Sequence, residues 1–197
     1  ALFESVFRVL DEIAPRYAMD GFVREPEGTG TINACPHGHF PSGDGKFLAI
    51  ACTTDKMFER LTVAMKRPDL LEKFRDQVVR LKSRKEVLDE VEKWTLSMPR
   101  DKSIEICTQS GVPAGAINSI ADIFEDPHFE ARKLLKKINV PQLGEVTVPN
   151  VIPGLSESPG ELTKLGPGLG EDNIALYQEE LGLSDKDLSR LRESGVI

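Results

Sequence analysis

The amino-acid sequence predicts a mixed α/β protein with a core of its own. The chain has 197 residues, of which 40% are hydrophobic, and this is enough for one large domain or two small ones. Apolar residues recur at helical spacing between residues 55 and 100, whereas residues 46–52 and 138–148 hold short apolar runs that are typical of strands. We therefore expect helices packed around short sheets.

Charge and hydropathy exclude several classes of partner. The chain has 25 Lys and Arg residues against 32 Asp and Glu residues, a net charge of -7, whereas nucleic acids and anionic membranes attract proteins with excess positive charge. No apolar run approaches the ~20 residues that a membrane-spanning helix needs. We expect a cytoplasmic protein with neither nucleic acid nor membrane as a partner.

The three cysteines of the chain are predicted to be reduced thiols. They are odd in number and widely spaced, which favours a cytosolic protein over a disulfide framework. Cys52 ends an apolar run and Cys107 follows Ile104 and Ile106. Both are therefore predicted to be small buried hydrophobic residues and not nucleophiles.

The first residues form an apolar stripe at helical spacing. Leu2, Phe3 and Val6 begin this stripe, and neither an initiator Met nor a capping side chain precedes it. A helix that starts uncapped at the first residue indicates a piece of a longer polypeptide. At the far end, Ser184 can cap a short helix that Gly195 ends. We expect the chain to be a carboxyl-terminal portion.

Residues 17–45 are predicted to form a long loop. They are rich in Gly, Pro, Asp and Thr, with turn signals at residues 25–30 and 41–45. Loops of this length inside a compact chain are usually functional or disordered. The loop leads into the apolar run at residues 46–52, which we expect to be a buried strand.

Residues 55–100 are predicted to be helical, with an interruption at Pro68. Ser83 and Glu86 have the spacing of a capping box ahead of a further apolar stripe. Trp94 belongs to that stripe and is expected in the core. Four basic residues gather nearby, and we expect them to form a solvated helix face and not a phosphate site. These residues are Arg80, Lys82, Arg84 and Lys85.

The remaining chain alternates turns with short elements. Residues 110–115 are expected to connect to a helical stretch that includes Ile117 and Phe124, and residues 129–135 to form another short helix. Two short strands are predicted within residues 138–148. A Pro- and Gly-rich surface segment should follow, and then two helices at residues 173–181 and 184–193, separated by Gly182.

Cys35, His37 and His39 form the most reactive-looking cluster in the sequence. Thiolate and imidazole are suitable zinc ligands, but this spacing lacks the second ligand pair of a structural zinc site. We therefore predict no metal site. The cluster is expected to lie in an active-site loop or a hairpin loop, where it supplies hydrogen bonds or packing. Gly28–Gly30 and Gly166–Gly170 are only fragments of phosphate-binding motifs.

Several segments, taken in order, resemble the class III (CaiB/BaiF) coenzyme A transferases. The similarity covers essentially all 197 residues. The segments that carry it are Pro36–Ala51, Gly111–Ile120, Glu125–Phe129, Leu169–Asn173, Glu180–Ser184 and Ser194–Ile197.

The resemblance implies a particular domain organisation. A subunit of that family has a large Rossmann-like domain and a small domain, and two subunits thread through each other like chain links. Here residues 1–20 would be a linker helix leaving the large domain. Residues 21–135 would be a small α+β domain with a short sheet, flanking helices and a loop at residues 28–45. Residues 136–197 would return to pack on the large domain.

The resemblance also implies an activity. The family's nucleophilic aspartate forms an acyl anhydride and then a CoA thioester, and it would lie upstream of this chain. No residue here is therefore assigned a catalytic role, and the chain alone is expected to be inactive. The expected ligands are an acyl-CoA and an organic acid as substrates, with no separate cofactor and with a homodimer as the assembly.

Four residues are the expected substrate contacts. These residues are Cys35, His37, Gly38 and His39. Formyl-CoA transferases carry a run of glycines in this loop, which this sequence lacks. That departure argues against oxalate as a substrate and leaves the histidines as donors to a carboxylate. Thr54 stands where racemases of the family carry an acidic residue, which favours transfer over racemisation. A non-catalytic binding or assembly subunit of the same fold, or an acyl-CoA racemase, remains the alternative.

Overall fold

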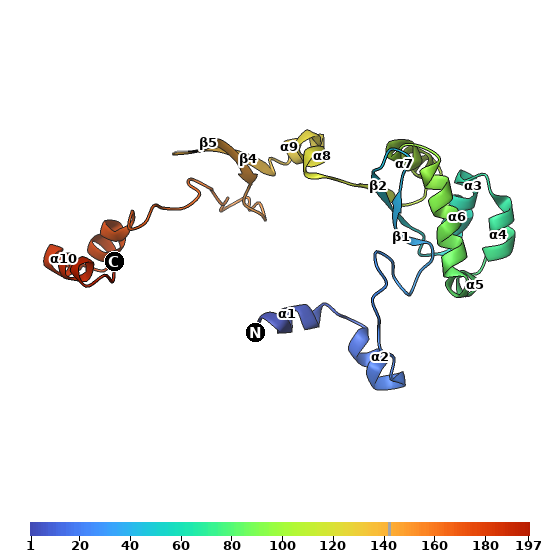
Figure 1. Ribbon diagram of the computed structural model, residues 1–197, viewed down its shortest axis with the longest axis horizontal. Helices are drawn as coiled ribbons and strands as arrows, with labels where there is room; N and C mark the ends of the chain where they lie inside the picture. Colours follow the sequence, from blue (N-terminus) through green and yellow to red (C-terminus); the bar gives the residue numbers. More distant parts are fainter. Residues whose placement is uncertain (142) are drawn as a thin grey trace. The chain divides into compact units, whose positions relative to one another are not determined.

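The computed structural model describes residues 1–141 and 143–197. The chain divides into two compact units, Ala1–Asn118 and Ser119–Ile197. Figure 1 colours the chain from blue to red along the sequence. The boundary between these units lies after Asn118, whereas the sequence places the end of the small domain at residue 135. In the described part of the chain, no helix is both long and apolar enough to cross a membrane.

Two short helices replace the single helix expected at the start. They are α1 (Leu2–Arg8) and α2 (Ile13–Asp20). Asp11 lies between them with a φ of 49°, a left-handed conformation that a continuing right-handed helix does not allow. The predicted loop consequently begins at Gly21 and not at residue 17. None of the residues of α1 or α2 is buried, so the apolar stripe of α1 faces solvent.

A three-stranded antiparallel sheet organises the first unit. Its strands are β1 (His37–Pro41), β2 (Phe47–Ala51) and β3 (Ala114–Ile117), in the order β1-β2-β3. Strand β2 confirms the predicted buried strand. Two expectations were wrong: residues 37–41 were assigned to a loop, and residues 114–117 to a connector leading into a helix. Both segments pair with β2 along their length, and this pairing satisfies backbone groups that a loop would leave to water.

Five helices connect β2 to β3. The first four lie within the helical region predicted at residues 55–100 and confirm it, whereas the fifth lies beyond that region and was not predicted. The predicted interruption is confirmed as well, because Pro68 begins a new helix at a position where its missing amide hydrogen is not needed. The helices are α3 (Asp55–Ala64), α4 (Pro68–Phe74), α5 (Gln77–Lys82), α6 (Arg84–Leu96) and α7 (Arg100–Gln109). Thr54 caps α3 by accepting from the backbone N–H of Met57 at 3.3 Å, and Asp76 caps α5.

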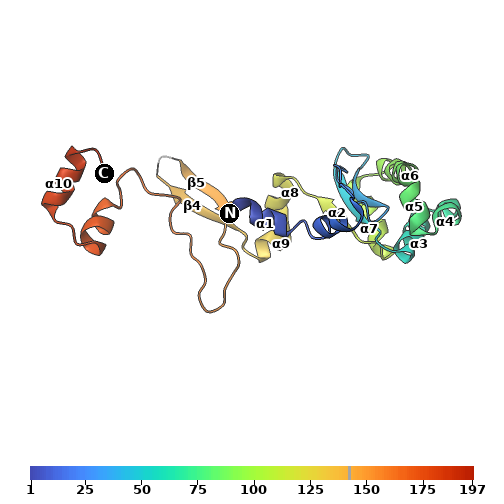
Figure 2. The same ribbon diagram turned by 90° about the horizontal axis from the view of Figure 1, so that it is seen from below.

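The helices cover one face of the sheet, where the core lies. Helices α3–α6 lie together on one side of β1 and β2 (Figures 1 and 2). Leu48 and Ile50 of β2 face this side and are at most 1% exposed, while Phe47 of the same strand is 49% exposed. Side chains of a strand alternate between its two faces, so the second face of the sheet stays open. Trp94 is half-buried against the core, as predicted.

The capping box predicted at Ser83 does not form. Ser83 is the N-cap residue of α6, but its side chain makes no capping hydrogen bond. The carboxylate of Glu86 pairs instead with the ammonium group of Lys73 on α4. A contact between helices has therefore replaced the local one that the spacing predicts.

Arg80 contradicts the solvated basic face expected for this region. Its side chain is fully buried. Three of its nitrogen atoms donate to the carbonyl oxygens of Cys35, Phe74 and Arg75 and to the Asp55 carboxylate, at 2.6 to 3.0 Å. The guanidinium also lies 4.5 Å from the ring centroid of Phe58. Burial is tolerated because all three nitrogen atoms of the planar group have acceptors and the ring of Phe58 lies against it.

The second unit contains a hairpin between short helices. The predicted strands form β4 (Leu135–Val140) and β5 (Gly144–Pro149), which pair antiparallel (Figure 2). The helices are α8 (Ile120–Glu125), α9 (Pro127–Ala131), the π-helix η1 (Ile174–Glu180) and α10 (Asp185–Glu193). Ser184 caps α10 as predicted. Leu135 lies in a strand and not in the helix expected at residues 129–135.

Candidate functional site

The segment that leads into β1 is fixed by helix α5. The side-chain amide of Gln77 donates to the carbonyl oxygen of Asn33 at 2.8 Å, and Arg80 donates to that of Cys35 at 2.7 Å. The peptide bond between Cys35 and Pro36 is cis. This part of the predicted loop therefore has a defined path before it enters the sheet.

A small pocket of about 140 Å³ lies along β1, which is an edge strand. This volume is below the roughly 300–1,000 Å³ of pockets for drug-sized ligands, so it suits only a small molecule. Three parts of the first unit line it: the turn at residues 27–30, strand β1 and helix α6. The lining residues are Glu27, Thr29, Gly30, His37, Gly38, His39, Phe40, Arg84, Leu88 and Glu92.

The turn at residues 27–30 packs closely over β1 because two glycines allow it. The hydroxyl of Thr29 accepts from the backbone N–H of His39 at 3.1 Å. A Cβ atom at Gly38 would lie 3.4 Å from that hydroxyl oxygen, and one at Gly30 would lie 3.2 Å from the carbonyl oxygen of His37. A larger residue at Gly30 would therefore press the turn away from the strand, whereas the Cβ of an alanine at Gly38 would make ordinary contact with Thr29.

The two histidines of β1 are held on the same side of the strand. His37 and His39 are two residues apart, opposite in direction to the buried Phe40. His37 is half-buried and His39 is exposed. The Nδ1 atom of His37 is buried and has no hydrogen-bond partner within residues 1–141 and 143–197. Its capacity for a hydrogen bond is therefore unused in the described part of the protein.

Cys35 is separated from this pocket. Its side chain is 0% exposed and belongs to the core cluster. Burial raises the pKa of the Cys35 thiol, and the positive charges of Arg84 and Arg80 oppose that shift only in part. Of the four residues expected to contact substrate, the structure brings His37, Gly38 and His39 together and turns Cys35 inward.

The two other cysteines are also buried, as predicted. Burial raises the pKa of Cys52 to about 12 and that of Cys107 to about 11. Because the thiolate is the reactive form of cysteine, the folded protein presents three unreactive thiols. None of them can serve as a nucleophile in this unit.

Stability should consequently fall as the pH rises above 9. In the unfolded chain a thiol loses its proton near the ordinary pKa of 9.0, whereas folded Cys52 keeps its proton to about pH 12. In this window the folded state binds more protons, so each pH unit lowers the unfolding free energy by about 1.4 kcal/mol per thiol. Urea unfolding at pH 8.0 to 10.5, followed by Trp94 fluorescence, measures this slope. The Cys52→Ala variant should show a shallower slope, and an unchanged one would contradict the prediction.

Sequence reasoning missed the contribution of helix α6 to the pocket. Arg84, Leu88 and Glu92 are spaced by four residues and therefore share one face of the helix. That spacing is visible in the sequence. What it could not indicate is that this face looks toward β1 and not toward solvent.

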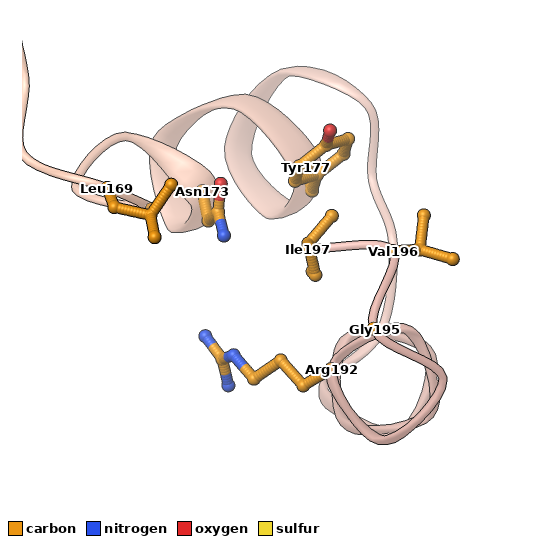
Figure 3. A pocket seen from close by; sticks show the side chains of 8 residues that line it. Leu169, Asn173, Tyr177, Arg192, Gly195, Val196 and Ile197 are labelled. Carbon is orange, nitrogen blue, oxygen red and sulfur yellow. The ribbon is translucent and has the colours of Figure 1, made fainter.

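A second cavity of about 670 Å³ lies in the other unit, between η1 and α10. Figure 3 shows the side chain of Arg192 extending toward Leu169 and Asn173, with Tyr177 and Ile197 beside this space. None of the residues expected to contact substrate lies there. In the part of the chain that the structure describes, no three His, Cys, Asp or Glu side chains gather as metal ligands would.

Fold and site together define a mixed α/β protein with a small polar pocket at a sheet edge. Comparison with known proteins identifies its family. The model of CoA-transferase family III matches residues 1–173, and the chain belongs to that family. The resemblance seen in the sequence is thereby confirmed.

Individual relatives agree with this assignment. The chain is 50% identical over its whole length to the alpha subunit of succinyl-CoA–L-malate CoA-transferase from Chloroflexus aurantiacus and 45% identical to the beta subunit. A crystal structure of a CaiB/BaiF family protein from Brucella suis matches 91% of the chain with a TM-score of 0.73 and 29% identity. The chain spans about half the length of these relatives, 46% of the alpha subunit and 50% of the beta subunit.

Proposed function

We propose that this chain forms part of a cytoplasmic CoA transferase that exchanges coenzyme A between an acyl-CoA and a short organic acid. The identity of 50% along the whole chain to a succinyl-CoA–L-malate CoA-transferase subunit carries this proposal. The catalytic aspartate is expected on a stretch of polypeptide outside these 197 residues. By itself the chain should therefore bind the organic acid but not catalyse the exchange of coenzyme A.

The proposed reaction is a double exchange through the aspartate. The carboxylate attacks the donor thioester carbonyl and expels CoA thiolate, which leaves an acyl anhydride. The thiolate then attacks the aspartyl carbonyl, releases the donor acid and forms an aspartyl-CoA thioester. The acceptor carboxylate repeats these steps in reverse and leaves as its own CoA thioester. No atom changes its oxidation state, and the aspartate is regenerated.

Strand β1 would border the reacting acids in this proposal. His37 presents an unpartnered Nδ1 atom and His39 an exposed ring, and both can donate hydrogen bonds to a carboxylate. Gly38 lies between them in sequence and faces the other side of the strand, as Phe40 does. The side-chain oxygen of Thr54 is engaged as the cap of α3, which supports transfer over racemisation, since no extra acid or base stands at that position.

A trapping experiment tests the covalent mechanism. The chain would be co-expressed with a polypeptide corresponding to the other half of a family member, then incubated with succinyl-CoA and hydroxylamine. We expect an aspartyl hydroxamate by peptide mass spectrometry on the complementary polypeptide, and none when this chain is incubated alone. An assembly that exchanges CoA without any trappable aspartyl adduct would exclude the mechanism.

The assembly itself is part of the proposal. We infer a dimer in which subunits of this fold combine, and the relatives named as alpha and beta subunits of one transferase support pairing between related chains. A homodimer is the simpler form of such an assembly. A non-catalytic assembly role would appear in the trapping experiment as binding of the complementary polypeptide without an adduct.

A further inference from the structure

We propose that Arg84 binds the carboxylate of a short hydroxydicarboxylic acid that does not take part in CoA exchange, and so selects the acceptor. This inference rests on the proposed function and adds a residue to its site. It concerns the pocket along β1, where the first turn of α6 meets the edge of the sheet.

Arg84 supplies the positive charge of this pocket. Arg84 is the only Lys or Arg among the described residues that line this pocket. A Cβ atom placed on Gly30 would lie 3.6 Å from a terminal nitrogen of its guanidinium, so the absence of a side chain at Gly30 keeps the guanidinium accessible beside the turn. An acid with a second negative charge would find its one cationic partner here.

The arginines of this region differ in the partners of their guanidinium groups. Arg67 pairs with Asp69 and Glu90, and Arg80 is fully engaged. Arg84, by contrast, has no hydrogen bond or ion pair within residues 1–141 and 143–197, and only its charge acts on the buried Cys35. A half-buried guanidinium without a partner is suited to a carboxylate, which it can bind through two parallel hydrogen bonds.

The acidic residues of the pocket define the rest of the ligand. Glu92 lies eight residues along α6 from Arg84, about 12 Å by the helical rise, and Glu27 lies on the facing turn. Both carboxylates are exposed, where water and salt screen their repulsion of an anion. They can accept a hydrogen bond from a hydroxyl group. A hydroxyl and a remote carboxylate on one short acid match this arrangement.

Binding by the 197-residue chain tests the inference without any need for turnover. L-malate and its derivative with the remote carboxylate esterified would be titrated against the ¹⁵N-labelled protein, with the amides of Gly38 and His39 as reporters. We expect saturable shifts with L-malate, at least tenfold weaker binding for the ester, and the same loss for Arg84→Gln. The matched control is Lys82→Gln, which removes one exposed charge two residues away and should bind L-malate normally.

Other outcomes would overturn the inference. These are the absence of saturable malate binding by the wild-type chain, equal binding by Arg84→Gln, or equal binding of acid and ester. The inference and the proposed function fail separately. Arg84-dependent malate binding without transfer by the assembled protein would leave only the function refuted. Transfer with an unchanged KM for malate in Arg84→Gln would refute only the role of Arg84.

Discussion

Replacing Arg80 by Met should lower the unfolding free energy of the first unit by about 3 kcal/mol or more. The substitution keeps an unbranched apolar stem but removes the guanidinium, so the buried carbonyl oxygens of Cys35 and Phe74 and the part-buried one of Arg75 lose their donor. Each buried polar group that loses its partner costs ~1–3 kcal/mol. Loss of the ion pair with Asp55 adds little to this free-energy change, because the Asp55 side chain is 57% exposed and water can replace Arg80 as its partner.

Urea unfolding followed by tryptophan fluorescence measures this effect. Trp94 is the single tryptophan of the chain and lies in the first unit, so the signal reports that unit alone. The Lys82→Met variant is the matched control because it removes an exposed cation from the same helix, and its midpoint should not change. Equal midpoints for Arg80→Met and wild type would show that Arg80 is not the anchor described here.

Replacing Gly43 by Ala should destabilise the first unit by about 2 kcal/mol. A Cβ atom at this position would lie 2.7 Å from the carbonyl oxygen of Leu96 and 3.1 Å from that of Met98. Both neighbours are backbone atoms that cannot rotate away. The amide of Gly43 also donates to the carbonyl oxygen of Met98 at 2.9 Å, which fixes the turn against the end of α6. Overpacking of this kind typically costs ~1–3 kcal/mol.

Gly115→Ala, in strand β3 of the same unit, provides the control for Gly43→Ala. A Cβ atom at Gly115 would have no atom within 4 Å, and alanine restricts the unfolded chain more than glycine does. Its unfolding midpoint should therefore equal or slightly exceed that of wild type. If the two alanine variants were equally stable, the close approach at Gly43 would not be a constraint on the fold.

Local sequence patterns predicted much of the fold correctly. The strand around Leu48 and Ile50, the hairpin β4–β5 and the helices between residues 55 and 100 all follow from spacing within a few residues. The burial of Cys52 and Cys107 followed from apolar neighbours. Strand β1 was missed because it contains glycine and proline, which are rare in strands. Its conformation depends on pairing with β2 and not on its own composition.

The candidate site was predicted only in part. The segment His37–His39 attracted attention by its chemistry and does line a pocket, but its Cys35 neighbour turns into the core. Arg80 and Arg84 looked alike in sequence, as members of one basic run. One is fully buried under four hydrogen-bond acceptors and the other lines the pocket. Which face of a short helix meets its neighbours is not encoded in a run of like charges.

The sequence by itself determined the family, the periodic helices and the strands whose apolar residues need a core. These properties depend on residues near one another in the chain, or on similarity along all of it. Tertiary structure alone decided that residues 27–30, 37–40 and 84–92 share one pocket, and that Arg80 is buried. The physical reason is that pairing at a sheet edge, and the desolvation of a charge, are set by partners that lie tens of residues away.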